Sequence, residues 1–381
     1  MRAHLNNILR LGVKELYSLR SDLVLVFLIL YTFTFAIYSV ATGVRTEVRN
    51  ASIAIVDEDH SELSGRLRAA FLRPYFKPAV ELSLNQVDDV MDAGRFAFVV
   101  DIPPKFEADV LAGHDPVLQL NVDATAMTLA GNGTLYIQNI INQEVAKFVF
   151  GVEARSMLPV SLIIRARFNP NLESSWFMAV MQIISNVTML SLILSGAAVI
   201  REREHGTIEH LLVMPLNPGE IMLAKIWANG LVIVLAAIMS LYAIVQGVLA
   251  VKINGSIMVF ALGAAVFLFA MTALGITLST IAKSMPQFGL LSIPFFVVMN
   301  MLSGGVTPLE SMPRVLQAIM QVAPSTHFTS FSQAVLYRGA GLDVVWPQLA
   351  AMVGIGTGLI AMHSRVSVPQ WQRRADLTQH R

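Results

Sequence analysis

One histidine pair in the chain has a spacing close to that of a zinc site. His205 and His210 flank Glu209 in the segment HGTIEH. Zinc-binding helices of proteases place two histidines four residues apart, so that both rings point from one face. Here the separation is five residues, which puts the two rings about 140° apart on a helix. We therefore predict no metal site in this segment.

An acidic cluster with a neighbouring histidine runs from Asp57 through Glu58 and Asp59 to His60. It follows a predicted strand, and ligands often bind at strand ends in α/β domains. Four consecutive residues on a turn rarely converge on a metal ion, however. We favour a solvated turn in which Ser61 caps the next helix.

The chain offers no other pattern of catalytic chemistry. It has no cysteine, which excludes thiolate metal sites and cysteine nucleophiles. No paired carboxylates, Ser-His-Asp set or G-x-x-x-x-G-K-[ST] motif stands out, so the chain has no P-loop for nucleotide. We predict no catalytic residue and no cofactor in this chain.

The composition predicts an integral membrane protein. Hydrophobic residues make up 55% of the 381 residues and charged residues only 14%, far from the averages of soluble proteins. The net charge of +1 gives no reason to expect nucleic acid. Apolar runs of about 20 residues can each cross the bilayer. Six spans are predicted, at 23–44, at 176–200, three within 226–303, and at 344–363.

Lysine and arginine predict the orientation of these spans. Cations precede the first span, lie in the connector 201–225 and fill the tail 364–381, whereas the short loop between the third and fourth spans has only Lys252. The positive-inside rule places both termini in the cytoplasm. Residues 1–22 have an amphipathic pattern typical of an interfacial helix. A signal peptide is the alternative for the first span, but its apolar run is too long.

The segment 45–175 differs from the rest and predicts an extracytoplasmic α/β domain between the first two spans. Short β-branched and aromatic runs alternate with helical patterns. The predicted strands are 51–56, 95–100 and 117–122, and the predicted helices are 61–72, 85–93 and 104–112. A longer helix over 126–158, broken near Gly131 and Gly133, is expected to lead back to the membrane.

The connector 201–225 resembles that of a known family. It has the pattern E-R-E-x-G-T-x-E-x-L-x-x-x-P-x-x-x-x-E-x-x-x-x-K, which is similar to the permeases of ABC-2 type exporters, in the longer form with a large periplasmic domain. The residues that match are Glu202, Arg203, Glu204, Gly206, Thr207, Glu209, Leu211, Pro215, Glu220 and Lys225. The resemblance covers nearly the whole chain.

The resemblance implies that the connector docks on a separate cytoplasmic ATPase, which binds ATP and Mg²⁺. Charges of both signs suit a polar docking surface, and Thr207 is a candidate cap for a short helix that Pro215 ends. The residues expected to couple the two subunits are Glu202, Arg203, Glu204, His205, Gly206, Thr207, Glu209 and Pro215. An ordinary solvated loop is the alternative.

Two further groups of polar residues are candidates for the transport route. In the second span, Gln182 and Asn186 either line a translocation path or only pack against other helices. The segment 304–343 is too apolar for a free loop, and the resemblance implies short outer-leaflet helices that form a gate. The polar residues expected at that gate are Glu310, His327 and Arg338. An interfacial cap is the alternative.

These observations favour the membrane subunit of an ATP-driven exporter in the bacterial inner membrane. The spans contain no ionisable residue in their interiors, whereas ion-driven pumps usually do. The resemblance implies an ATPase, a second permease copy or a paralogue, and in some cases a periplasmic membrane-fusion protein as partners. The alternative is a receptor whose outer domain binds a ligand without transport. The uncharged path suggests amphiphilic cargo, with drugs, lipids and glycans all compatible.

Overall fold

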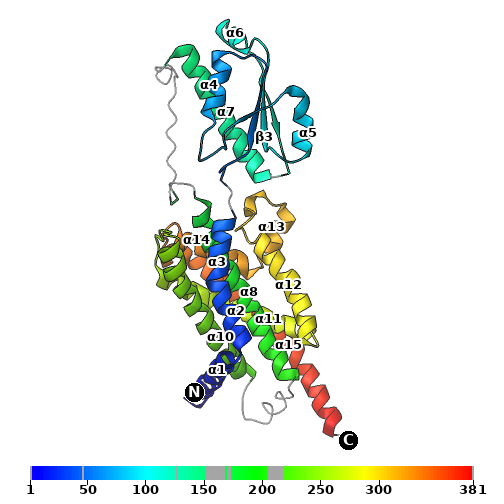
Figure 1. Cartoon of the computed structure of the whole chain (residues 1–381). Helices are drawn as coiled ribbons and strands as arrows, with labels where there is room; N and C mark the ends of the chain where they lie inside the picture. Colours follow the sequence, from blue (N-terminus) through cyan, green and yellow to red (C-terminus); the bar gives the residue numbers. More distant parts are fainter. Residues whose placement is uncertain are drawn as a thin grey trace. The chain divides into compact units, whose positions relative to one another are not determined.

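The computed structural model of the chain describes residues 2–44, 47–125, 127–151, 168–169, 173–204 and 218–379. The chain divides into two compact units (Figure 1). We call Met1–Val44 with Ser175–Arg381 the membrane unit and Arg45–Ser174 the α/β unit. Each unit is described by itself.

Six helices among the described residues are long and apolar enough to cross a membrane. They cover Leu23–Gly43, Ser174–Arg201, Leu223–Val248, Ile257–Ile281, Met285–Leu302 and Leu342–Met362. The predicted architecture of six spans with a small α/β region between the first two is confirmed.

The membrane unit is helical throughout its described part. Its elements are α1 (Arg2–Ser21), α2 (Leu23–Phe33), α3 (Phe35–Gly43), α8 (Ser174–Glu204), α10 (Pro218–Ser240), the π-helix η3 (Leu241–Val248), α11 (Ile257–Ile281), α12 (Met285–Leu302), the 3₁₀ turn η4 (Leu309–Ser311), α13 (Arg314–Met320), α14 (Pro324–Leu336) and α15 (Leu342–Gln379).

The first span is interrupted, which its apolar composition does not predict. Thr34 lies between α2 and α3 with φ −123° and ψ −81°, outside the helical region. Its hydroxyl donates to the carbonyl of Leu30 at 2.5 Å, and such bonds compete with the helical ladder. The break leaves carbonyl groups near it in need of other donors.

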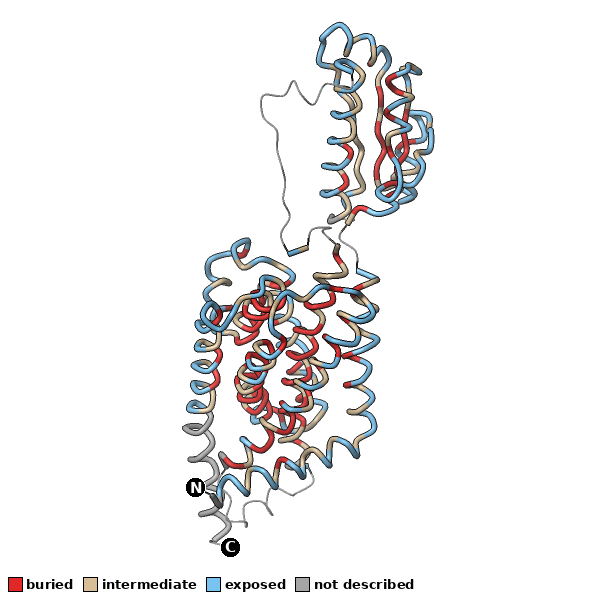
Figure 2. The backbone as a smooth tube through the Cα atoms, turned by 90° about the vertical axis from the view of Figure 1, so that its left-hand side faces the viewer, coloured by how far each residue is buried: buried red, intermediate tan, exposed pale blue. Residues whose placement is uncertain are grey.

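The core of the membrane unit lies around α8 and α11. In the second span 72% of the most apolar window is buried and in the fourth 56%, against 17% in the fifth and sixth. Figure 2 shows this contrast as a buried centre surrounded by more exposed helices. The exposed spans present their apolar side chains to lipid or to another subunit.

The segment after the fifth span forms two short helices of opposite character. On α13, Val315 and Ile319 are exposed, as expected for a helix at the membrane interface. On α14, by contrast, ten of the thirteen residues are buried, and Phe328 stacks on Phe267 of α11 at 4.1 Å between ring centroids. The second helix is therefore a part of the bundle core.

The α/β unit contains a four-stranded mixed sheet. Its strands are β1 (Ile53–Asp57), β2 (Val80–Glu81), β3 (Phe98–Ile102) and β4 (Gln119–Val122), in the spatial order β2-β1-β3-β4. The first three strands are parallel, and β4 is antiparallel to β3. The two-residue edge strand β2 was not predicted from the sequence.

Helices cover both faces of this sheet. One face packs against α4 (Glu62–Ala70), α6 (Phe106–Leu111) and α7 (Met127–Phe150). The other packs against α5 (Val87–Asp92), which follows the 3₁₀ turn η1 (Leu84–Gln86). The predicted break of α7 near Gly131 and Gly133 is wrong. A Cβ at position 133 would lie 2.1 Å from the Phe98 ring, so this glycine lets a continuous helix approach the sheet closely.

Candidate functional site

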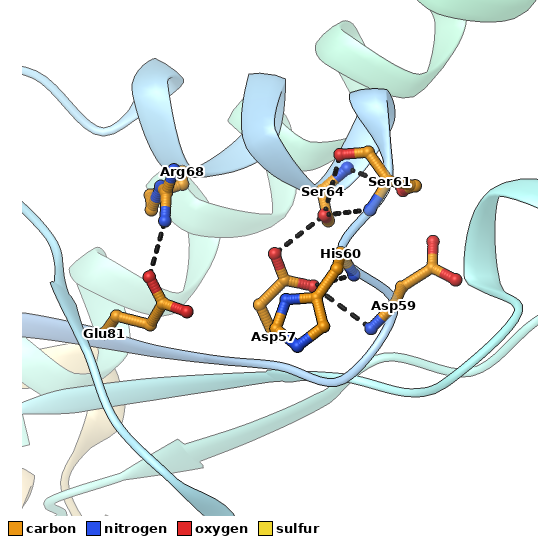
Figure 3. A network of polar contacts seen from close by, with 7 residues as sticks. All are labelled: Asp57, Asp59, His60, Ser61, Ser64, Arg68 and Glu81. Carbon is orange, nitrogen blue, oxygen red and sulfur yellow. Dashed lines mark hydrogen bonds and ion pairs between the residues drawn. The ribbon is translucent and has the colours of Figure 1, made fainter.

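The acidic turn after β1 is a helix-capping network (Figure 3). The Asp57 carboxylate accepts hydrogen bonds from the backbone amides of Asp59 and His60 and from the Ser64 hydroxyl at 2.8 Å. Ser61 and Ser64 form a reciprocal capping box at the start of α4. The interpretation of this turn as a structural cap therefore agrees with its contacts.

Asp59, also in this turn, is hydrogen-bonded to α6 and does not take part in a metal-binding cluster of described residues. Asp59 accepts from the backbone amide of Glu107 at 3.0 Å, and Glu107 accepts from the amide of Leu63 at 2.8 Å. Burial raises the pKa of Asp59, but hydrogen bonds from Ser61 and from backbone amides outweigh it and lower that pKa overall. Among the described residues, no three His, Asp or Glu side chains gather as metal ligands.

The predicted coupling segment lies partly outside the described residues. His205, Gly206, Thr207, Glu209 and Pro215 are not described. Glu202 and Arg203 lie in the last turn of α8, which continues beyond the second span to Glu204.

Glu204 has a contact that its sequence pattern does not reveal. Its Oε1 accepts a hydrogen bond of 2.9 Å from the backbone amide of Met285, the first residue of α12. The cap residue Ser284 makes no side-chain capping bond of its own. A carboxylate at a helix N-terminus is stabilised by the free amides and the helix dipole. Glu204 thus joins the end of the second span to the start of the fifth.

The amphipathic helix α1 packs against α10, beyond the other end of the coupling segment. The Trp227 indole lies against Gly12, where an added Cβ would come within 2.1 Å of the ring. The indole Nε1 donates to the carbonyl of Ile8 at 3.1 Å. The glycine therefore allows the close approach that this hydrogen bond needs.

Ion pairs add to this packing. Lys225 Nζ lies 2.9 Å from Glu15 Oε1, and the lysine side chain is only 4% exposed. His4 Nδ1 lies 2.5 Å from Glu220 Oε1. The pair of Lys225 and Glu15 is largely buried, and the loss of one member of a buried pair is costly, so this pair helps to fix α1 against α10.

A third contact joins α8 to α2. Arg201 Nη1 lies 3.4 Å from Asp22 Oδ2, and Asp22 also caps α2 by accepting from the amide of Leu25 at 3.2 Å. We call the set Glu15, Asp22, Arg201, Lys225 and Trp227 the α1 anchor. α1, the end of α8 and the start of α10 meet at one end of the membrane unit, while α13 lies at the other (Figure 1).

The two predicted path residues are joined to each other and to α2. Gln182 Nε2 donates to Asn186 Oδ1 at 2.9 Å, and Asn186 Nδ2 donates to the carbonyl of Thr32 at 2.5 Å. Asn186 is 3% exposed and serves a carbonyl beside the break at Thr34. Nearby, Ser185 donates to Asn300 of α12 at 2.5 Å.

The three predicted gate residues are not brought together. Glu310 in η4 and Arg338 beyond α14 are exposed, and His327 is half-buried near the start of α14. The His327 ring nitrogen Nε2 lies 2.8 Å from the carbonyl of Gln321. No hydrogen bond or ion pair links these three described side chains.

The sequence patterns missed most of the α1 anchor. Arg201 and Lys225 were placed in the connector, but their partners on α1 and α2 were not identified. The available signal was the helical pattern of 1–22 itself. Gly12 and Glu15 place a small residue and an acid on the same side of the helix as Ile8 and Leu19, which is typical of a helix that packs on another.

Comparison with known proteins identifies the family of the chain. Residues 23–363 match the protein family described as ABC-2 family transporter protein. The chain therefore belongs to the ABC-2 transporter family. It is a membrane permease subunit and not the ATPase of such a transporter.

Particular relatives cover most of the chain. The inner membrane transport permease YhhJ of Escherichia coli (strain K12) is 53% identical over 93% of this chain and 94% of its own. The probable multidrug ABC transporter permease YbhR of the same strain is 28% identical over 84% and 88%, and YbhS, with the same description, is 25% identical over 78% and 79%. The chain is thus a multi-pass inner-membrane protein.

Proposed function

We propose that this permease is the membrane subunit of an ATP-driven exporter and that a separate ATP-binding subunit acts on residues 201–225. The observation that carries the proposal is the bonding of both borders of this segment to other helices. On one side Arg201 and Glu204 reach α2 and α12; on the other, Lys225 and Trp227 reach α1.

This arrangement suits mechanical coupling. A displacement of the segment by the ATPase pulls on the end of α8, and the Glu204 carboxylate carries the movement to the first amide of α12. The α1 anchor holds the start of α10 and the start of α2 together, so these helices move as one group. Packed helices transmit small shifts because interfaces shift between discrete arrangements and do not deform continuously.

We further propose that both termini and the coupling segment face the cytoplasm. Cations gather on α1, at 201–225 and in the tail, and few lie in the opposite short loops. The α/β unit between the first two spans then faces the periplasm, where a membrane-fusion protein is a candidate partner.

Energy for transport enters from outside the bilayer in this proposal. No Asp, Glu, Lys, Arg or His lies in the interior of the six spans, whereas ion-coupled transporters usually keep such groups at membrane depth. A cytoplasmic ATPase supplies what the spans lack.

A second permease, either another copy or a paralogue, completes the proposed path. The fifth span is 17% buried and the first 22%, which leaves wide apolar faces for lipid and for a second subunit. We keep Gln182 as the path residue, since it is half-buried, and assign Asn186 to holding α2. Glu310, His327 and Arg338 remain the proposed outer-gate residues.

The proposed cargo is amphiphilic. The path carries amide and hydroxyl groups without charge, and two relatives are described as probable multidrug permeases. A susceptibility screen of a deletion strain against many toxic compounds tests this assignment, and unchanged susceptibility to every amphiphilic drug would count against drugs as the cargo.

Copurification with the ATP-binding subunit tests the coupling assignment. Glu204 is a poor site for this test, because its loss also disturbs α12. We expect Glu209→Lys to abolish copurification, since it reverses a charge in the docking segment. Asp115→Lys, the same change at an exposed position of the α/β unit, serves as the control and should leave copurification intact. Equal recovery of the ATPase with both variants would refute the assignment, and a permease that never recovers an ATPase would favour the receptor alternative.

A further inference from the structure

A cavity of about 170 Å³ lies among α1, α2, α8 and α10. Its lining is polar on one part and apolar on another. Lys14, Arg201 and Lys225 contribute three cations, while Leu25 and Leu194 contribute an apolar wall. Three residues of the α1 anchor, Glu15, Arg201 and Lys225, line this cavity.

The ends of the second and third spans place the cavity at the depth expected for lipid headgroups. Arg201 is the last residue of the second span, and Lys225 is two residues from the start of the third. The apolar wall comes from residues inside the first and second spans. A ligand here has a charged part at the membrane boundary and an apolar part beside the hydrocarbon.

The charges of the lining favour an anion. Glu15 is the one carboxylate among the lining residues, against three cations. Glu15 pairs with Lys225, and Asp22 contacts Arg201 only at 3.4 Å. Lys14 is exposed, and no hydrogen bond or ion pair joins it to another described residue. At least one cation thus remains for a ligand.

A buried amide in the lining also has no partner among the described residues. Asn229 is 3% exposed, and its Nδ2 is buried without a hydrogen bond to the described part of the chain. Buried donors are almost always satisfied because an unmade hydrogen bond is costly. An acceptor bound in the cavity would satisfy this nitrogen.

From these observations we propose that the cavity binds the phosphate group of an anionic phospholipid. Phosphate oxygens accept charge-assisted hydrogen bonds from Lys14 and Arg201 and a further bond from the Asn229 amide. The acyl chains continue beside Leu25 and Leu194 toward the bilayer. Ordinary anchoring of Lys and Arg at span ends explains the cations but not the buried unsatisfied amide.

The bound lipid would add a further contact to the α1 anchor. It bridges α1 to the ends of α8 and α10, which border the coupling segment. A ligand that binds only the assembled arrangement stabilises it in proportion to its occupancy. The lipid composition of the membrane therefore sets how firmly α1 is held.

The test uses the full chain in phosphatidylcholine nanodiscs, with phosphatidylglycerol added in steps and the thermal midpoint as the readout. We expect the midpoint of the wild type to rise with phosphatidylglycerol. Lys14→Gln should raise the half-saturating phosphatidylglycerol content about tenfold, because a tenfold change in affinity corresponds to the loss of about one charge-assisted hydrogen bond. Asn229→Leu should weaken the response similarly, each variant being compared with its own midpoint in phosphatidylcholine alone.

Arg10→Gln is the matched control, because Arg10 is exposed on α1 and does not line the cavity. It should change the half-saturating content less than about twofold, the size expected for diffuse surface attraction at physiological salt. The proposal is refuted if Lys14→Gln and Arg10→Gln respond alike, or if Asn229→Leu responds as the wild type does. A parallel titration with inorganic phosphate separates the sources: an equal shift of the wild-type midpoint would overturn the lipid as the ligand.

Discussion

The contact between Gly12 and Trp227 allows a sharp test of how α1 is held. A methyl group at position 12 would lie 2.1 Å from the indole ring, whereas carbon atoms in contact are best separated by about 3.5–4.0 Å. In the Gly12→Ala variant, α1 and α10 must therefore move apart by more than an ångström. The hydrogen bond from Trp227 to the carbonyl of Ile8, 3.1 Å long, cannot survive such a shift.

The expected cost follows from two opposing effects. Overpacking a tight contact costs about 1–3 kcal/mol, while alanine in place of glycine stabilises a helix by about 0.5–1 kcal/mol. Taken from the middle of both ranges, the net loss in the docking free energy of α1 is about 1–2 kcal/mol. A loss of that size raises the undocked population about 5- to 30-fold.

The absence of cysteine from the chain makes this population measurable. A single Ile8→Cys substitution places a thiol on the half-buried side of α1, and its rate of maleimide labelling reports the undocked fraction. We expect Gly12→Ala to raise that rate about 5- to 30-fold.

Two controls make the result decisive. Gly289→Ala is the same change within α12, where an added Cβ meets nothing within 4 Å, and it should leave the labelling rate nearly unchanged. Trp227→Leu removes the ring, so Gly12→Ala should have little further effect in that background. If Gly12→Ala labels at the wild-type rate, or accelerates labelling equally without the ring, α1 does not depend on this contact.

Three further predictions concern other contacts. Glu15→Gln should lower the thermal midpoint in detergent, because it removes one carboxylate partner from the buried Lys225 and the loss of such a partner costs up to about 3–5 kcal/mol. Lys225→Met should restore part of the loss, and an additive double variant would contradict the pairing. Asn186→Leu should lower the thermal midpoint, because it removes the donor to the Thr32 carbonyl. An unchanged midpoint would mean that Asn186 does not hold α2, and it would again be a candidate for the translocation path. Burial and, to a smaller extent, the charge of Glu58 raise the pKa of Asp101, so the folded protein loses stability as pH rises through that pKa and Asp101 ionises. Asp101→Asn should therefore raise the thermal midpoint at pH 7, and this gain should vanish below about pH 4, where the carboxyl is neutral. An equal gain at both pH values would refute the charge effect.

The sequence predicts the architecture well because single segments carry its signals. A run of apolar residues long enough to span a bilayer needs no partner to be identified. Likewise, the strands of the α/β unit have local alternation and turn residues on either side. β2 has only two residues, too few for any periodic signal.

The contacts around the candidate site depend on residues far apart in the chain. Glu15 and Lys225 are separated by 210 positions and Glu204 and Met285 by 81, so no local pattern reveals either pair. The burial of α14 could not be predicted for the same reason. Its hydroxyl-rich sequence resembles an interfacial helix, and only packing against α11 and α15 buries it.

The burial of α8 has a consequence for biosynthesis. Two of its hydroxyls donate to later helices, Ser195 to Thr272 of α11 at 3.0 Å and Ser185 to Asn300 of α12, yet α11 ends roughly 80 residues later in the chain. At a synthesis rate of about 5–20 residues per second, α8 is complete some 4–16 s before that partner emerges. During this interval the polar side chains of the second span depend on shielding by a chaperone or insertase. A chain truncated before α11 never gains these partners, so we expect the cell to degrade it.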